Sequence, residues 1–460
     1  MLRTISPVDG SVVAERPLAN TQQVAQAIKQ ARAAQQQWQA YTLSQRASIC
    51  ETAVQYFERN SQQIASEISW QMGRPIVYCG GEINGLAQRA RHMINIAPKA
   101  LADINPVASP GVTTFIRREP LGVVFTIAPW NYPLLTTVNS LIPALMAGNS
   151  VVLKPSAQTP LCGEHFVKAF MQAGVPEHLV QCLFLGHKDS ANIVASGEVD
   201  FVCFTGSVAG GQHMEQAAAG TFLGLGLELG GKDPAYVRSD ADVPYSAEQL
   251  VDGAFFNSGQ SCCGVERIYV HHSVYKAFVA AFIKHVNSYQ LGDPLDPATT
   301  LGPVVKPAAA NWVRGQISDA QAAGAKALID TSIFPLDDGK GCYLAPQVLV
   351  DVDHSMSVMK DESFGPVVGI MKVADDAQAL SLMNDSQLGL TASIWTQDQD
   401  VAITLGEQLQ TGTVFMNRCD YLDPALAWTG VKNTGKGQTL SELGYHQLTR
   451  AKSFNLKSNL

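Results

Sequence analysis

The first 130 residues of the chain show two different periods of apolar residues. From Thr21 to about Gly73, Ala, Val, Ile and Leu recur at helical spacing, as in VAQAIKQARAAQQQW. This period predicts two or more amphipathic helices. Residues 113–128, TTFIRREPLGVVFTIA, are rich in β-branched and aromatic residues instead. Pro120 and Gly122 divide this stretch into two predicted strands, of which the second is expected to be buried.

Short apolar segments then alternate with helical ones. SVVLKP, VQCLFLG and VDFVCFTGS are strand-like, and LCGEHFVKAFMQAG and SANIVASG between them are helical. This alternation is typical of βαβ units and predicts a parallel sheet, which would bind ligands beyond the carboxyl ends of its strands, where LKPS and FTGS lie. From about residue 245 a helix, a strand at RIYVH and a long helix follow. This restart predicts a second α/β domain.

Length and composition agree with a large globular protein. The chain has 460 residues, which is too many for one ordinary hydrophobic core, so we expect two or three domains. Hydrophobic residues make up 46% and charged residues 16%, without a low-complexity tract, which predicts compact folding. The formal net charge is -8 and no basic cluster occurs, so nucleic acid is not an expected partner.

The cysteines and the apolar runs bear on location. The start of the chain has no apolar signal core and no run of about 18 apolar residues follows, so we expect a cytoplasmic protein without membrane association. Nine scattered cysteines, an odd number, favour a reducing compartment over a disulfide framework. No HxxxH or CxxC spacing occurs, so no metal site is predicted.

Three residues are candidates for catalysis. A thiol attacks a carbonyl carbon only as a thiolate, so it needs a lowered pKa or a partner base, usually helped by a turn that exposes backbone N–H groups. Cys262 follows such a turn-forming run, Asn257–Gly259. Glu228 in LELGGKDP has apolar neighbours that would raise its pKa toward that of a general base. The Asn131 amide in APWNYPL could donate to an oxyanion. Each candidate also has a purely structural interpretation when it is considered alone. Cys262 could be an ordinary buried cysteine, Glu228 could pair with a buried arginine, and Asn131 could belong to a packed turn.

Taken together, the motifs point further. APWNYP, LKPS, FTGS, ELGGKDP, NSGQSC, ESFGP and TGTVFMN occur in the order and approximate spacing of the aldehyde dehydrogenase superfamily, NAD(P)-dependent and of the hydrolytic type. The chain resembles that superfamily over essentially its whole length. The resemblance implies an α/β fold with a Rossmann-like cofactor-binding domain, a second α/β catalytic domain and a small β flap for oligomerisation.

The resemblance implies roles for the three candidates. Cys262 would attack the aldehyde, and Cys263 would be its neighbour on the substrate side. The Asn131 amide and the Cys262 backbone N–H would hold the oxygen of the thiohemiacetal. After hydride transfer to the nicotinamide, Glu228 would activate the water that hydrolyses the thioester.

The cofactor is expected to be NAD or NADP. FTGSVAGG is not GxGxxG and would be weak evidence without the other motifs. Lys154 would reach the adenine ribose, and Glu362 and Phe364 would hold and flank the nicotinamide ribose. The cofactor-binding residues implied by the resemblance are Trp130, Lys154, Ser156, Ala157, Gly206, Ser207, Gly211, Leu229, Glu362 and Phe364.

One departure bears on cofactor choice. Strict NAD users of the family often have a glutamate three residues after the lysine, and Ala157 occupies that position here. Loss of that negative charge would leave room for a 2'-phosphate, to which Ser156 could donate. NAD and NADP both remain open.

The motifs identify the substrate less directly than the cofactor. Succinate-semialdehyde relatives tend to have an arginine eight residues after the oxyanion asparagine, and Asn139 stands there instead. The expected substrate is therefore an uncharged aliphatic or aromatic aldehyde, with a semialdehyde as the alternative. Trp428 is expected to narrow the mouth. The predicted tunnel, a mixed surface without a charge, is formed by Tyr132, Leu135, Thr136, Asn139, Ser261, Cys263, Leu426 and Trp428.

The resemblance also suggests domain limits and assembly. The expected cofactor-binding domain covers 1–101 and 121–230, the oligomerisation hairpin 102–120 and the catalytic domain 231–432, and 433–460 returns to the cofactor domain and ends in an oligomerisation strand. A homodimer or a pair of dimers is expected, because an unpaired strand edge is an aggregation hazard. Two rival functions remain. One is acyl transfer to coenzyme A, although relatives that catalyse it generally lack a base at the position of Glu228. The other is a purely structural role without catalysis.

Overall fold

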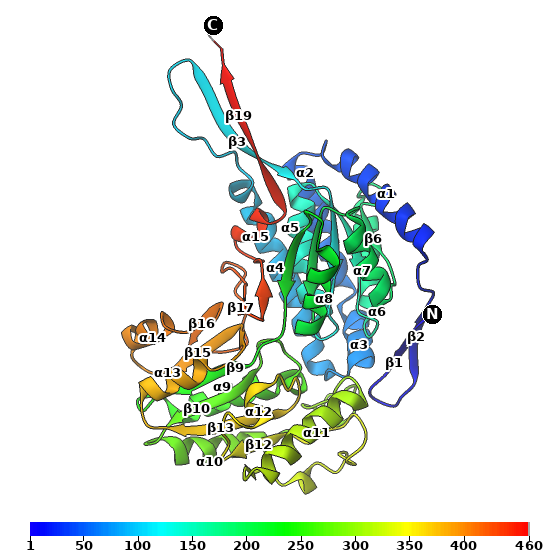
Figure 1. Cartoon of the computed structure of the whole chain (residues 1–460). Helices are drawn as coiled ribbons and strands as arrows, with labels where there is room; N and C mark the ends of the chain where they lie inside the picture. Colours follow the sequence, from blue (N-terminus) through cyan, green and yellow to red (C-terminus); the bar gives the residue numbers. More distant parts are fainter. Residues whose placement is uncertain (459–460) are drawn as a thin grey trace.

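Two mostly parallel sheets organise the fold (Figure 1). The computed structural model describes residues 1–458. The first sheet has the strand order β18-β8-β7-β4-β5-β6, in which only β18 runs antiparallel to its neighbour. Its strands are β4 (Val123–Ile127), β5 (Ser150–Lys154), β6 (Val180–Cys182), β7 (Phe201–Thr205), β8 (Gly224–Glu228) and β18 (Gly435–Lys436).

This strand order creates a ligand crevice. The chain runs from β4 outward to β5 and β6 and then returns to add β7 and β8 on the other side of β4. Connections therefore leave β4 and β7 in opposite directions. In open α/β sheets, such a switch point opens a crevice at the carboxyl ends of the strands.

Helices cover both faces of the first sheet. Val123, Phe125 and Ile127 pack with α1, α7 and α8, whereas Val124 faces a core formed with α2 to α6. Burial on both faces explains the continuous apolar sequence of β4. The helices are α1 (Thr21–Trp38), α2 (Leu43–Arg59), α3 (Ser61–Met72), α4 (Ile76–Ala100), α5 (Pro133–Ala147), α6 (Pro160–Ala173), α7 (His187–Ser196), α8 (Val208–Ala218) and α15 (Leu443–His446).

The second sheet lies in the lower half of Figure 1 and has the order β11-β12-β13-β10-β9-β15-β16. Its strands are β9 (Asp233–Val237), β10 (Val265–His271), β11 (Lys326–Ala327), β12 (Gln347–Val350), β13 (Val367–Val373), β15 (Thr391–Trp395) and β16 (Thr413–Met416). Two apolar cores cover its faces. The helices of this half are α9 (Val243–Phe255), α10 (Tyr275–Val286), α11 (Pro307–Ala322), α12 (Ser357–Lys360), α13 (Asp376–Asn384) and α14 (Gln399–Gly406), with the 3-10 turns η1 (Phe256–Gly259) and η2 (Thr331–Ile333).

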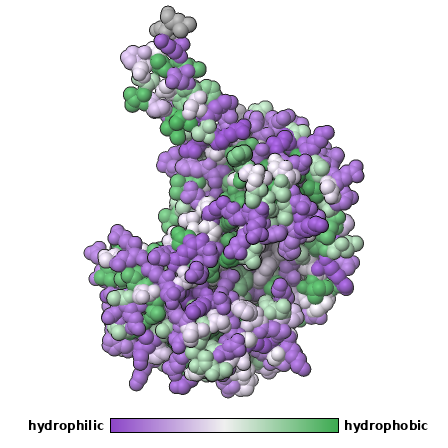
Figure 2. Space-filling model, viewed as in Figure 1, coloured by the Kyte–Doolittle hydropathy of each residue, from purple (hydrophilic) through white to green (hydrophobic). Residues whose placement is uncertain are grey.

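A two-stranded arm projects from the body of the molecule (Figures 1 and 2). It consists of β3 (Val112–Pro120) and β19 (Thr449–Lys457), paired antiparallel, with Phe115 opposite Phe454 and their rings stacked at 4.4 Å. An isolated bridge joins Ile104 to Ile116. The remaining short strands are β1 (Leu2–Ile5) with β2 (Val12–Arg16), and β14 (Leu388–Gly389) with β17 (Val431–Lys432).

The predicted α/β class is confirmed, with two largely parallel sheets. The helical period over residues 21–73 corresponds to α1, α2 and α3. The predicted division near Gly122 separates β3 from a fully buried β4, and Gly122 has a φ of +137°, which few other residues adopt. The residue limits of the domains stay a prediction. No helix within residues 1–458 is long and apolar enough to cross a membrane.

A buried ion pair connects the helical layer to the region between the sheets. The Arg74 guanidinium pairs with the Glu82 carboxylate, donates to the Asn131 carbonyl and donates to Asn257 Oδ1 at 3.1 Å. Glu82 also accepts the backbone N–H of Leu134 at 2.7 Å, at the start of α5. Both charged residues are almost completely buried. The pair therefore fixes the start of α5 and the loop after α9 relative to each other.

Replacing Arg74 by methionine should lower the free energy of unfolding by about 3 kcal/mol or more, because it leaves the buried Glu82 carboxylate without its partner. The double variant Arg74→Met with Glu82→Met should recover part of that loss. Arg91→Met breaks only an exposed pairing with Glu51 and Glu58 and should cost about 1 kcal/mol or less. Denaturant unfolding measures all three, and equal effects of Arg74→Met and Arg91→Met would contradict the expectation.

Candidate active site

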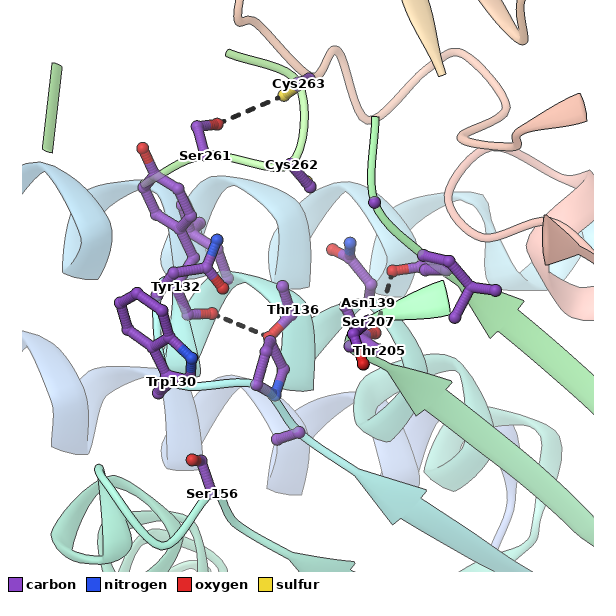
Figure 3. A pocket seen from close by; sticks show the side chains of 18 of the residues that line it. Trp130, Tyr132, Thr136, Asn139, Ser156, Thr205, Ser207, Ser261, Cys262 and Cys263 are labelled. Atoms are coloured by element: carbon purple, nitrogen blue, oxygen red, sulfur yellow. Dashed lines mark hydrogen bonds between the residues drawn. The ribbon is translucent and has the colours of Figure 1, made fainter. Parts of the chain in front are cut away.

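A cleft of about 1220 Å³ lies where the two sheets meet. The first sheet contributes residues that follow the carboxyl ends of its strands, such as Trp130 after β4 and Ser207 after β7. The second sheet contributes residues that precede its strands, such as Cys262 before β10 and Phe364 before β13. The predicted switch-point crevice is thus closed by loops of the other half (Figure 3).

The loop before Cys262 has an unusual backbone. Asn257, Ser258 and Gly259 have φ values of +53°, +57° and +70°. Two consecutive non-glycine residues in the left-handed region are costly and persist only where contacts hold them. The Asn257 side chain accepts from Arg74 and donates to the Gln260 carbonyl at 3.2 Å, and Ser258 donates to the Gly302 carbonyl at 2.7 Å. These contacts fix the backbone that presents Cys262.

The two adjacent thiols have different surroundings. Cys262 is partly exposed and lines the cleft. Cys263 is buried, and its Sγ donates to Asp420 Oδ1 at 2.9 Å. Its interaction with the Cys262 thiol and its burial raise the pKa of Cys263 well above the usual value. Figure 3 shows Cys263 directed toward Ser261. Of the two, only Cys262 combines access to the cleft with freedom from a carboxylate partner.

Asn131 lies beside the loop that carries Cys262. Its Nδ2 donates to the Gln260 carbonyl at 3.2 Å, and this bond uses one of its two amide hydrogens. Its own carbonyl accepts from Arg74. Arg74 therefore holds the backbone of Asn131 and Gln260 holds its side-chain amide, which keeps one hydrogen for an oxygen atom near Cys262.

Glu228 ends β8 and lines the same cleft as Cys262 and Asn131. Burial raises the pKa of its carboxyl, and hydrogen bonds from Thr439 and Thr205 oppose that rise. Thr439 Oγ1 donates to Oε1 at 2.5 Å and Thr205 Oγ1 donates to Oε2 at 3.2 Å. A cavity of about 20 Å³ adjoins the carboxylate, which is room for about one water molecule.

Several polar groups at the other end of the cleft fit a dinucleotide. Lys154 is 8% exposed, and burial lowers the pKa of its ammonium. That ammonium has no hydrogen-bond or ionic partner within residues 1–458. A ribose hydroxyl would provide one. Ser207 caps the N-terminus of α8, where backbone N–H groups attract phosphates. The residues present therefore fit NAD or NADP.

Glu362 and Phe364 approach this region from the second half. Phe364 stands edge-on to Trp130 with ring centroids 5.6 Å apart. Glu362 Oε1 accepts the Gly231 N–H at 3.1 Å, and burial raises the pKa of the Glu362 carboxyl to about 8. Glu266 accepts the backbone N–H groups of Ser363 and Phe364 and so fixes this loop.

Most of the predicted site residues line the cleft. They are Trp130, Asn131, Tyr132, Leu135, Thr136, Asn139, Lys154, Ser156, Gly206, Ser207, Glu228, Leu229, Ser261, Cys262, Cys263, Glu362, Phe364 and Trp428. Three others lie outside its lining. Ala157 is exposed, Leu426 is 59% exposed, and Gly211 packs against Leu229, where a Cβ would overlap the leucine side chain.

Sequence reasoning missed several charged residues of the cleft, namely Arg74, Glu82, Arg89, Asp252, Lys306 and Asp420. Two of them contact predicted tunnel residues, Arg89 at Asn139 and Asp420 at Ser261. The expectation of a lining without charge is therefore wrong. Arg89 comes from α4, in a segment that no motif marks. A signal was available, because Glu82, Leu86, Arg89 and Met93 follow helical spacing, so that a charge falls on the apolar face of the helix.

Comparisons with known proteins agree with this geometry. The sequence profile described as the aldehyde dehydrogenase family matches residues 1–454. The chain is 32% identical to an aldehyde dehydrogenase of Paenarthrobacter nicotinovorans, over 98% of this chain and 99% of the relative. It is 31% identical to a succinate-semialdehyde dehydrogenase [NADP(+)] of Mycolicibacterium paratuberculosis, over 98% and 96% of the two chains.

The fold agrees with solved structures as well. The NADP-dependent glyceraldehyde-3-phosphate dehydrogenase from Bacillus halodurans, complexed with NADP, superposes with a TM-score of 0.93. Sequence identity is 32%, and the match covers 99% of this chain and 95% of that one.

Proposed function

The chain belongs to the aldehyde dehydrogenase family and is an oxidoreductase that acts on aldehydes with NAD or NADP, and we propose that it oxidises its substrate to the carboxylic acid through a covalent adduct on Cys262. The observation that carries the proposal is the common cleft of Cys262, Asn131 and Glu228. An aldehyde, the oxidised cofactor and one water would give a carboxylate, the reduced cofactor and two protons.

Cys262 is the proposed nucleophile because it is the partly exposed thiol of the cleft and donates to no carboxylate, unlike Cys263. Its Sγ would form a bond to the aldehyde carbon while the carbonyl oxygen takes up the electron pair of the C=O bond. The Asn131 Nδ2 hydrogen and the backbone N–H of Cys262 would donate to that oxygen. Because Arg74 and Gln260 already hold Asn131, the donors need no rearrangement as charge develops.

The cofactor would be held by groups from both halves of the molecule. Lys154 would bind the adenine ribose, the α8 N-terminus at Ser207 the phosphates, and Glu362 the nicotinamide ribose. When bound, the nicotinamide accepts a hydride from the substrate carbon. Phe364 and Trp130, in contact across the cleft, would flank the ring and exclude water from it.

Glu228 favours hydrolysis over acyl transfer to another thiol. With its pKa raised by burial, its carboxylate is a stronger base than an exposed glutamate. It would take a proton from the water that attacks the Cys262 thioester, which releases the carboxylic acid and returns the thiol. An acylating or a purely structural protein has no need of such a base.

For the choice between cofactors we propose that NADP is accepted along with NAD. Ala157 places no carboxylate near Ser156, whose hydroxyl lines the cleft. A 2'-phosphate at this position would therefore meet no negative charge from residue 157. Two of the family relatives named above use NADP according to their descriptions.

For the substrate, two classes remain as proposals. The apolar and aromatic side chains of Leu135, Tyr132 and Trp428 suit an uncharged aliphatic or aromatic aldehyde. A semialdehyde is the alternative, and it is supported by the similarity to a succinate-semialdehyde dehydrogenase. The charged side chains of Arg89 and Asp420 in the tunnel affect the choice between these two substrate classes.

We further propose that the arm joins two copies of the chain. In the described residues β19 pairs with β3 on one side only, so its other edge exposes unpaired backbone groups. Apolar Ile104, Val107 and Leu456 are exposed on the arm as well. A second copy would cover both features. Nine free thiols, within a chain whose cysteines are all described, suit a reducing compartment such as the cytoplasm.

Cys262→Ala should abolish aldehyde oxidation, because the adjacent Cys263 thiol is buried and hydrogen-bonded to Asp420. Cys263→Ala should retain most of the activity and serves as the matched control. The rate of reduced nicotinamide formation measures both variants. If Cys263→Ala lost activity and Cys262→Ala kept it, the nucleophile would be Cys263 instead of Cys262.

Glu228→Gln should lower steady-state turnover by about 100-fold or more, while the first turnover still yields reduced nicotinamide in a burst. In the wild type, the ionised fraction of Glu228 grows as pH rises through its elevated pKa, so turnover should rise with pH over that range. The variant should lack this rise. Stopped-flow absorbance across pH tests this, and a variant with the wild-type pH profile would exclude Glu228 as the base.

Cofactor affinity should rise with pH up to about 8, because the Glu362 carboxyl has a pKa of about 8 without a ligand. Ribose hydroxyls would donate to the carboxylate, which favours its ionised form and lowers the pKa of Glu362 in the complex. Binding then releases a proton between the two pKa values and strengthens as pH increases. Calorimetric titration with the cofactor checks this, and Glu362→Gln should make the affinity independent of pH in this range.

A further inference from the structure

Arg89 is a buried cation of the cleft without an anionic partner. Its side chain is 8% exposed, and it forms no ion pair with any carboxylate of residues 1–458. Lys154 and Arg267 are likewise buried without a carboxylate partner among residues 1–458, whereas two other buried cations have one. Arg74 pairs with Glu82, and Lys232 pairs with Glu266 at 2.5 Å. A buried charge without a partner is costly, and proteins rarely keep one without a use.

The hydrogen bonds of Arg89 leave one edge of its guanidinium open. Nη1 donates to the Leu135 carbonyl at 3.1 Å and to Asn139 Oδ1 at 3.3 Å. Nε and Nη2 have no partner in the described chain. Neither atom is fully enclosed by the protein, so both can be reached from the cleft that Arg89 lines. Two parallel N–H donors on one edge match the two oxygens of a carboxylate.

Arg89 also lies in the electrostatic environment of the reaction. Burial lowers the pKa of its guanidinium, and interactions with Cys263, Glu228, Glu82 and Cys262 act against that lowering. Such influence between side chains requires proximity within a poorly solvated site. Arg89 also lines the same cleft as Cys262 and Glu228, so one short molecule could place its aldehyde at Cys262 and a second group on the open edge of Arg89.

We propose that Arg89 is the anion anchor of the substrate tunnel, so that the aldehyde oxidised here carries a carboxylate on the same short chain. This inference rests on the proposed function and narrows its substrate class to oxo acids. Asn139, the residue that suggested a tunnel without a cation, accepts from Arg89 and orients it. The cation is present, but it reaches the tunnel from α4 instead of α5.

The charge balance of the tunnel favours a carboxylate over other groups. Glu228, Glu82 and Asp420 are acidic residues of the lining close enough to interact with Arg89. The Asp420 Oδ1 already accepts from Ser261 and Cys263, both at 2.9 Å. A doubly charged phosphate on Arg89 would leave one negative charge without a partner close to Asp420. A cationic amine would be repelled by Arg89. One guanidinium edge and a singly charged carboxylate compensate each other.

The test compares 4-oxobutanoate with its neutral counterpart butanal in three proteins. The wild type should prefer the oxo acid in kcat/KM. Arg89→Met should lose about 30-fold or more on the oxo acid, mainly through KM, because charge-assisted hydrogen bonds disappear. Its loss on butanal should be far smaller. Arg91→Met, on the same helix but exposed and paired with Glu51 and Glu58, should match the wild type with both substrates.

Two outcomes would overturn the assignment. A wild type without preference for the oxo acid would show that the tunnel does not select a carboxylate. Equal losses of Arg89→Met on both substrates, together with a shifted pH profile, would show that Arg89 acts on the Cys262 thiolate instead. Thermal unfolding should show that Arg89→Met is no less stable than the wild type, because it removes an uncompensated buried charge.

A binding measurement on the wild type needs no variant at Arg89. Butanoate should compete with the aldehyde much more strongly than butanamide, which has the same shape without the charge, and equal inhibition by the two would contradict an anion anchor. Failure of this inference is distinguishable from failure of the proposed function. A protein that oxidises butanal through Cys262 without selecting oxo acids disproves only the anchor, whereas a protein that oxidises neither aldehyde disproves the function as well.

Discussion

The buried guanidinium of Arg74 is the constraint on which the rest of the site depends. It contacts three segments that are far apart in sequence, through Glu82, Asn131 and Asn257. Asn131 carries the proposed oxyanion donor, and Asn257 belongs to the left-handed turn that presents Cys262. An arginine can join three segments because its planar fork offers five donors in fixed directions. The nucleophile and the oxyanion donor thus share one rigid reference point.

The cleft keeps ionisable groups in states that bound ligands would change. Burial raises the pKa values of Glu228, Glu362 and Asp420 and lowers those of Lys154 and Arg89. Each shift is the cost of holding a charge away from water. A ribose hydroxyl at Lys154 or a carboxylate at Arg89 would supply the missing partner. Burial of these charged groups therefore contributes to both the affinity and the specificity of ligand binding, because a ligand supplies the partner that water would otherwise provide.

The two sheets divide the work of the site. The first sheet, through its switch point, forms the part of the cleft that suits a dinucleotide. The second sheet contributes loops at the amino ends of its strands, which carry Cys262 and Glu362. Neither half holds a complete set of reacting groups, so the chemistry requires both to be packed together. The contact between Trp130 and Phe364 marks this junction.

The sequence by itself determined the α/β class, the family and the motif residues of the cleft, because these depend on local periodicity and on ordered motifs. Cys262, Glu228 and Asn131 each lie in such a motif. Arg89, Asp420 and the Arg74 pair do not, and only the tertiary structure brought them to the site. Helical spacing places Arg89 on an apolar face, but it cannot tell a buried structural charge from one that opens into a tunnel. That difference depends on which groups of α5 lie opposite, and only the packed structure decides it.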